Sequence, residues 1–346
     1  MNGTLVESPE PEIVPSRWMA VTSWVLTGLA LFLVLQLHLV SALLAGLLVY
    51  ELVHVLAPIV ERLLTHHWAR VAALATLTTC IVSLLLAGIW AGLDFLKSDV
   101  INADVFSQKV AQILTDARQQ LPALIVESLP ANVDDLKAYG ADWVDQHGKE
   151  LGTLGQDVLH FMFRGLIGLV VGAMLSIFEL PPLSTLRPLP KQLALRAKCF
   201  SDCFRQVVFA QVRISAINTT LTAIFLLVVF PAFGVHIPLA KTLLVVTFLT
   251  GMIPEVGNLI SNSLICIAAL SVSFVASIGA LVFLVFIHKL EYFLNARIIG
   301  GQIEARAWEL LIAMLVMEAA FGIPGVIAAP IFYAYIKREL IYLRLV

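Results

Sequence analysis

The chain has 346 residues, of which 60% are hydrophobic and 13% charged, and its formal net charge is −2. Its mean hydropathy of +0.92 lies far above that of soluble globular chains, which excludes the soluble protein classes. We predict an all-α, polytopic integral membrane protein whose first partner is the lipid bilayer, and we expect no nucleic-acid partner.

The chain begins with a polar tail, residues 1–17, which carries three glutamates and no basic region. It therefore does not read as a cleaved signal peptide, and we expect a cytoplasmic tail. About 20 apolar residues are needed to cross the ~30 Å hydrocarbon core. Three stretches within residues 18–93 meet that length and are predicted to be transmembrane helices: 18–35, 39–60 and 69–93.

Charge then changes sign along the chain. Residues 94–157 hold eleven Asp or Glu against five Lys or Arg, and their apolar residues recur every three or four positions, which predicts a small amphipathic helical insert in water. A fourth transmembrane helix follows at 158–182, and then a basic segment at 183–206. Basic loops near span ends stay in the cytoplasm, so the insert is expected to be extracytoplasmic and both termini, including the tail 337–346, cytoplasmic.

Residues 207–336 are predicted to form the transport core. A span at 207–230 precedes a long apolar run, 239–270, which Ile253-Pro-Glu-Val-Gly-Asn258 interrupts. Proline removes a backbone donor and a carboxylate in hydrocarbon is costly, so this run is predicted to be broken into two arms. A helix at 271–294 leads to a second broken run, 308–336, interrupted at 322–326. Paired broken segments are typical of a transporter's substrate site.

Two readings of the broken runs remain open. Each run crosses the membrane once as a kinked helix, or each is a re-entrant hairpin whose tip stops at mid-membrane. Arms of about 14 residues reach only ~21 Å, which favours hairpins inserted from opposite faces, the first from outside and the second from inside.

Polar groups at membrane depth must be satisfied by protein or water, and they often mark a pathway. Some of these polar groups could instead have purely structural roles. The amides could join helices, the first tip could be a plain Pro-Gly kink, and Glu291 with Asn295 could cap a helix end. The candidate substrate or ion pathway residues are Gln211, Asn218, Pro254, Glu255, Gly257, Asn258, Asn262, Glu291, Asn295, Glu318, Gly322, Pro324 and Gly325.

Enzyme signatures are not found in the sequence. The patterns His-Glu-x-x-His, Gly-x-Ser-x-Gly and the phosphate-binding Gly-x-x-x-x-Gly-Lys are absent, and Cys199 and Cys203 have no histidines nearby to complete a metal set. We therefore expect no enzymatic activity, no cofactor and no metal site. Without a nucleotide loop, active transport would draw on an ion gradient.

Several motifs together resemble the autoinducer-2 exporter (AI-2E) family of bacterial membrane proteins. They are the stretch from Phe209-Ala-Gln-Val-Arg213 to Asn258, then Glu291-x-x-x-Asn295-x-Arg297-Ile-Ile-Gly300, and Phe321-Gly-Ile-Pro-Gly-Val-Ile-Ala-Ala-Pro330. The resemblance implies about eight membrane segments, homo-oligomers such as pentamers, a location in the bacterial inner membrane, and export of small solutes or exchange of cations for protons. Two function classes follow: a gradient-driven transporter with an elevator-like mechanism, and a non-transporting membrane scaffold or accessory subunit.

Overall fold

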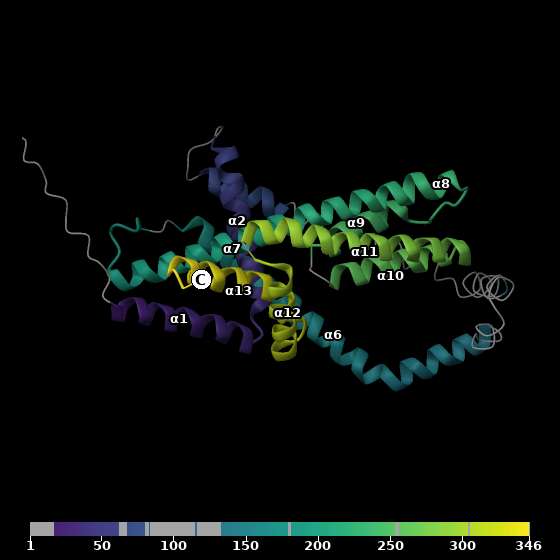
Figure 1. The fold of residues 1–346 in the computed structure, drawn as a ribbon, viewed down its shortest axis with the longest axis horizontal. Coiled ribbons are helices and arrows are strands. Elements are labelled where there is room, and N and C mark those ends of the chain that lie inside the picture. Colours follow the sequence, from purple (N-terminus) through teal and green to yellow (C-terminus); the bar gives the residue numbers. More distant parts are fainter. Residues whose placement is uncertain are drawn as a thin grey trace, which may run out of the picture.

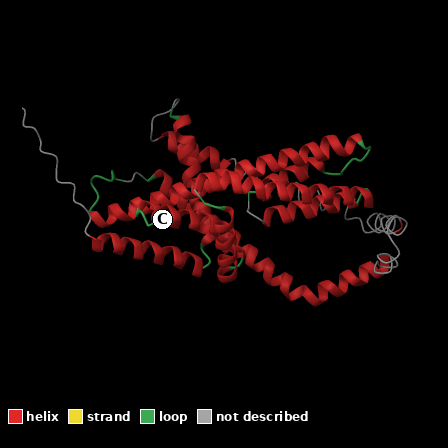
Figure 2. Ribbon diagram, viewed as in Figure 1, coloured by secondary structure: helices red, strands yellow, loops and turns green. Residues whose placement is uncertain are grey.

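The computed structural model describes residues 17–61, 68–79, 83, 115, 133–178, 181–252, 256–303 and 305–345. Every regular element in these residues is a helix and none is a strand, as the sequence predicts (Figures 1 and 2). The helices with defined bounds are α1 (Arg17–Gln36), α2 (Val40–Val60), α6 (Val133–Ile177), α7 (Pro188–Ile224), the π-helix η1 (Phe225–Val229), α8 (Phe230–Ala232), α9 (Ala240–Thr250), α10 (Val256–Leu270), α11 (Phe274–Ile303), α12 (Ala307–Phe321) and α13 (Ile323–Tyr342).

Among the described residues, four helices are long and apolar enough to cross a membrane. They cover Trp18–Gln36, Val40–Val60, Gly155–Ile177 and Pro188–Ala232. Shorter apolar helices follow in the second half of the chain, at α9, α10 and the first part of α11. Of the predicted span 69–93, residues 69–79 are helical, and most of the remainder lies outside the described residues.

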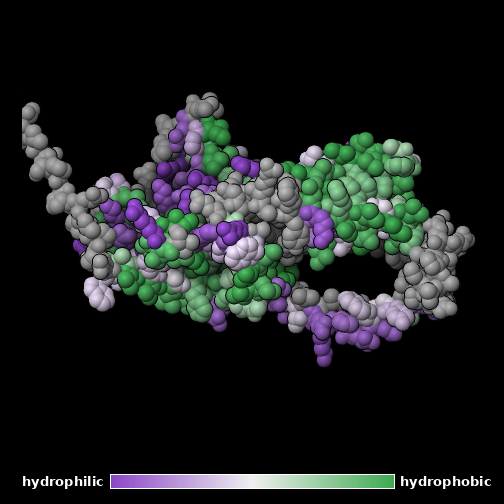
Figure 3. All heavy atoms as spheres, viewed as in Figure 1, coloured by the Kyte–Doolittle hydropathy of each residue, from purple (hydrophilic) through white to green (hydrophobic). Residues whose placement is uncertain are grey.

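Helix α6 joins the predicted insert to the predicted fourth span without a break. Its 45 residues correspond to roughly 67 Å at 1.5 Å per residue, more than twice a membrane core. The first half carries five of the eleven acidic residues of the insert, and hydrophilic side chains gather there in Figure 3. The described part of the predicted insert, residues 133–157, is thus continuous with the predicted fourth span, in a helix that bends along its length (Figure 1). Residues 94–132, apart from Thr115, lie outside the described residues.

The membrane half of α6 is fixed by close packing of small residues on α2. A Cβ atom on Gly168 would lie 2.0 Å from the Ala42 carbonyl oxygen, and one on Gly172 would lie 2.1 Å from the Gly46 carbonyl oxygen. Small residues four apart on both helices thus let the two backbones touch, which is a common way to associate helices in lipid.

Substituting Gly172 with alanine is expected to lower the free energy of unfolding by about 1–3 kcal/mol, because the added methyl group overpacks this contact. Gly28→Ala is the matched control, since a Cβ on Gly28 has nothing within 4 Å. The control should be neutral or stabilising, as alanine favours helix over glycine. Thermal denaturation of both variants in detergent measures the contrast, and equal effects would contradict this packing.

Helix α7 likewise merges the predicted basic segment with the following span. It continues through η1 and α8, giving 45 helical residues from Pro188 to Ala232. The π-helical turn at Phe225–Val229 is an uncommon element that often marks a functional site. Phe225 of this turn stacks on Phe283 of α11, with ring centroids 3.7 Å apart and planes at 7°.

Both apolar runs within residues 207–336 are broken where the sequence predicts. The first consists of α9 and α10, which pack against each other, and the second of α12 and α13, which meet at Gly322. At 1.5 Å per residue the 11 residues of α9 reach only about 16 Å and the 15 residues of α10 about 22 Å. Both arms of this run are shorter than the ~30 Å hydrocarbon core. In the second run α12 has 15 residues, but α13 has 20 and reaches about 30 Å, so this arm is longer than the 14 residues expected from the sequence.

The buried apolar side chains form two main clusters that share one helix. The first joins α7 residues from Phe200 to Ile214 with α13 and the ends of α1 and α2. The second joins η1 and α8 with α9, α10 and α11. Helix α7 and its continuation run through both, and Figure 1 shows α8 to α11 lying together at one end of the molecule.

Candidate functional site

The turn of the first broken run is held by polar side chains on one face of α7. Gln211 donates a hydrogen bond from Nε2 to the Gly251 carbonyl oxygen at 2.9 Å, and Ser215 donates from Oγ to the Phe248 carbonyl oxygen at 2.7 Å. Carbonyl groups at a helix C-terminus have no partner within their own helix. The two α7 side chains, both buried, therefore provide hydrogen-bond partners for carbonyl groups at the C-terminal end of α9.

One turn further along α7, two buried amides meet. Asn218 donates from Nδ2 to Oδ1 of Asn258 at 2.9 Å, and their side chains are 5% and 4% exposed. Asn258 lies in the first turn of α10, immediately beyond the break. The pair therefore joins α7 to the second arm of the hairpin by a neutral hydrogen bond in an apolar setting.

Gly257 is required by the close approach of the two arms. A Cβ on Gly257 would lie 1.7 Å from the Thr250 carbonyl oxygen and 3.0 Å from the Gly251 nitrogen. No side chain fits at that distance, so the turn depends on glycine there. Four predicted pathway residues, Gln211, Asn218, Gly257 and Asn258, are thus brought together at one turn.

The remaining candidates of the first run are not part of this arrangement. Pro254 and Glu255 lie outside the described residues. Asn262 is half-buried, one turn further along α10. Glu291 and Asn295 lie in α11, and their side chains are outside the described part of the structure.

The second break is built by glycine and proline in the way that the sequence predicts. Gly322 has φ 65° and ψ −151°, a conformation that is essentially restricted to glycine. Pro324 follows in the first turn of α13, and a Cβ on Gly325 would lie 2.1 Å from the Met317 carbonyl oxygen. Glu318 is exposed on α12, so the structure does not place its side chain beside the cluster on α7.

The sequence reasoning missed a buried ion pair at the opposite end of α7. Arg196 donates from Nη1 to Oε2 of Glu339 on α13 at 2.8 Å and from Nε to Oγ of Ser23 on α1 at 2.8 Å. Its guanidinium carbon also lies 4.3 Å from the ring centroid of Trp24. Arg196 and Glu339 are 7% and 5% exposed, so the pair ties three helices together in the interior.

Two further polar contacts lie in the same half of the molecule. Ser201 of α7 donates to Glu51 of α2, and both residues are buried. Glu309 at the start of α12 accepts hydrogen bonds from Lys337 and Tyr333 of α13. These bonds join α12 to α13 at the end of the second broken run that lies away from Gly322. Glu51 is an acidic residue within an apolar stretch. That is the sequence signal from which its contact with Ser201 could have been suspected.

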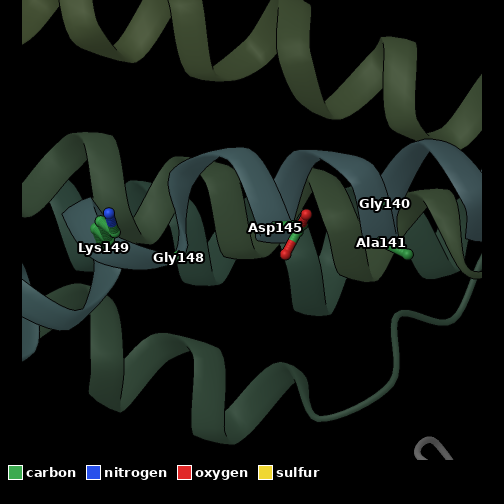
Figure 4. Close-up of a pocket in the computed structure, with 5 residues that line it drawn as sticks. All are labelled: Gly140, Ala141, Asp145, Gly148 and Lys149. Carbon is green, nitrogen blue, oxygen red and sulfur yellow. The ribbon is translucent and has the colours of Figure 1, made fainter.

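A surface hollow on α6 does not resemble a binding site. Its lining comes from one helix, and Figure 4 shows Asp145 and Lys149 on that helix beside Gly140, Ala141 and Gly148. All five residues are exposed, so a ligand there would stay largely in water. Among the described residues, no cluster of three His, Cys, Asp or Glu side chains is placed to hold a metal ion.

The described residues are all helical or loop, and they include several candidate spans. Two apolar runs are broken, and buried polar contacts lie at one break. This is the architecture of a polytopic membrane transport protein. The chain belongs to the AI-2E family of transporters, because the profile of the AI-2E family transporter matches residues 21–344. The resemblance found in the sequence is thereby confirmed, and the protein is a multi-pass membrane protein of a transporter family.

One relative is similar over part of the chain. A Bacillus subtilis (strain 168) protein called "Putative transport protein YdbI" is 28% identical over 205 residues, which are 58% of this chain and 57% of that protein. The match thus spans little more than half the length of the relative. No solved structure matches the chain.

Proposed function

We propose that this protein moves a small solute or ion across the bacterial inner membrane, driven by an ion gradient and by an elevator-like mechanism. Family membership supports transport, and the name of the Bacillus subtilis relative refers to it. The observation that carries the proposal is the buried Asn218–Asn258 pair at the turn of the first broken run. Polar groups at such a position are costly, and they are expected where a pathway needs them.

The proposal treats both broken runs as re-entrant hairpins. In the first run, arms of 11 and 15 residues are each too short to cross alone, and α9 packs against both α10 and α7. In the second run α12 has 15 residues but α13 has 20, so the hairpin reading rests there on the short α12 and on its packing against α13. The paired turns at Gly257 and Gly322 are the sequence feature that inverted-repeat transporters share. In this account the tip of the first hairpin enters from outside and that of the second from the cytoplasm.

The surface of the protein supports assembly into a homo-oligomer, for which a pentamer is our working hypothesis. Large apolar side chains are exposed along the transmembrane helices, and on α11 they include Val275, Val282 and Phe286. Lipid covers part of such a surface in any membrane protein. Glu318 stands on an exposed apolar face of α12 beside Leu315, and a subunit contact would shield that carboxyl group from lipid.

The alternative function is a non-transporting scaffold or accessory subunit. It is supported by the first half of α6, an exposed acidic helix that could dock a partner outside the membrane. In that case the broken runs would be packing kinks, and the buried amides would only join helices. The two accounts differ in what purified protein does in a vesicle.

Proton coupling is tested on Glu255 and Glu318, since acidic residues in membrane segments commonly mark proton relays. Proton uptake and solute flux are measured side by side in proteoliposomes for Glu255→Gln and Glu318→Gln. We expect the neutral amides to uncouple solute movement from the pH gradient while leaving fold and oligomer intact. If coupling is unchanged in both variants, these two acids are removed from the mechanism, and Glu291 and Asn218 become the next candidates.

The proposed orientation makes a separate prediction. A cysteine at position 142, in the acidic half of α6, should be labelled by an impermeant reagent in intact cells, whereas a cysteine at 198, in the basic half of α7, should not. Asp142 and Lys198 are both exposed, so access to the reagent depends on the side of the membrane. The reverse pattern would invert the topology.

A further inference from the structure

A polar segment of α7 separates the two main apolar clusters. Residues up to Ile214 belong to the first cluster, and residues from Phe225 onward belong to the second. Between them lies Asn218-Thr-Thr-Leu-Thr222, in which four of five residues have low helix propensity. The π-helical turn follows directly at Phe225–Val229. Between Phe200 and Val229, residues 215–224 are the stretch that adds no side chain to either apolar cluster, and 218–222 have a weak intrinsic preference for a regular helix.

The same segment holds buried oxygen atoms without hydrogen-bond partners. They are Asn218 Oδ1, Thr219 Oγ1 and Thr222 Oγ1, and Thr222 is 1% exposed. A buried polar atom with no partner raises the free energy of the state that buries it. These oxygens therefore raise the free energy of the conformation described here. A rearrangement that brings water to them would remove this cost.

The contacts on the two sides of this segment differ in strength. The first side is tied across helices by the buried Arg196–Glu339 ion pair and by Glu309 with Lys337. The tip of α9 and α10 is joined to α7 by neutral hydrogen bonds from Gln211, Ser215 and Asn218. Neutral hydrogen bonds of this kind can be exchanged for bonds to water at small net cost.

We infer that residues 215–222 of α7 are the hinge of the conformational change. The hairpin lobe, defined as residues 225–290, moves as one body against the anchor lobe, defined as α1, α2, residues 188–214 of α7, α12 and α13. Helix α11 continues past residue 290 to Ile303, so this end of α11 is the second connection between the lobes and bends together with the hinge. Opening breaks the contacts of the α9–α10 tip with α7 and hydrates Asn218 and Thr222, and closure restores the structure described above. The inference rests on the proposed transport function, but it concerns the movement of the two lobes and not the identity of the transported solute.

Pulsed electron spin resonance distances test the hinge in the full-length protein. Spin labels are placed on a cysteine-free background at Ile336 of α13 and Val282 of α11, one in each lobe, and at Ile267 and Val282 within the hairpin lobe. All three positions are exposed. Labelled protein is diluted with unlabelled protein in nanodiscs, so that distances between copies do not contribute.

We expect the pair that spans the hinge to show a second distance population, displaced by about 5 Å or more, as in other domain movements. The pair within the hairpin lobe should show one narrow population. Thr222→Val removes a buried unpartnered oxygen, and it should deplete the second population. Thr220→Val is the matched control and should leave both populations unchanged, because Thr220 is exposed and its hydroxyl already bonds to the Ala216 carbonyl oxygen.

A cross-hinge distribution as narrow as that within the lobe would overturn the inference, as would a second population that Thr222→Val leaves intact. Flux is measured separately on the same samples. A protein that shows two populations but transports nothing would retain the hinge and contradict the proposed function.

Discussion

Replacing Arg196 with methionine is expected to lower the free energy of unfolding by about 3–5 kcal/mol, because it leaves the carboxylate of Glu339 buried without its partner. The two groups are 2.8 Å apart and both are buried, so little water reaches either of them. The substitution also removes the hydrogen bond to Ser23 and the contact with Trp24, and α1 should loosen from the bundle.

Thermal denaturation in detergent measures this effect, with Lys198→Met as the matched control. Lys198 lies two residues away on the same helix and is exposed, so its loss should change stability little. The double variant Arg196→Met with Glu339→Leu should recover most of the loss, since an apolar pair can replace a buried ion pair. If Arg196→Met is no less stable than Lys198→Met, the ion pair does not support the fold.

Gly257→Leu is expected to abolish transport while the protein still inserts into the membrane. A Cβ at this position would lie 1.7 Å from the Thr250 carbonyl oxygen, so the turn must open to admit any side chain. Opening separates Asn258 from Asn218, and it withdraws the α9 carbonyl groups from Gln211 and Ser215. The spans themselves keep their hydrophobic lengths, and insertion depends chiefly on those.

Flux at equal membrane abundance measures this effect. Gly28→Leu is the matched control, because a side chain at Gly28 enters open space on α1. The control should transport at the wild-type rate. Wild-type flux in Gly257→Leu would show that the turn has no part in transport.

Local chemistry made the breaks predictable from the sequence. Gly322 adopts a backbone conformation that other residues avoid, and Gly257 lies where no Cβ fits. Both positions therefore require glycine, and a glycine within an apolar run can be recognised in the sequence. Gln211, Asn218 and Asn258 were also identified singly, because amides stand out in apolar stretches. That Asn218 pairs with Asn258, 40 residues away, follows only from the tertiary fold, in which α9 packs on α7 and α10 packs on α9.

Other features could not be read from one sequence. Arg196 and Glu339 are 143 residues apart, and each looks like an ordinary charge near the end of an apolar stretch. The sequence does not show whether α6 and α7 are continuous, because hydropathy changes along each helix whereas its backbone does not. The predicted boundaries at 157 and 206 follow this change in polarity and not a change in secondary structure.

Gradient-driven flux through the purified wild-type protein tests the central claim most directly. The protein is reconstituted into liposomes, and a panel of small metabolites and cations is followed with and without an imposed pH or sodium gradient. The account predicts movement of at least one solute or ion that is faster than in protein-free liposomes and that collapses when the gradient is dissipated. Flux across the whole panel at the protein-free rate, from protein shown to be folded, would contradict it and favour the scaffold.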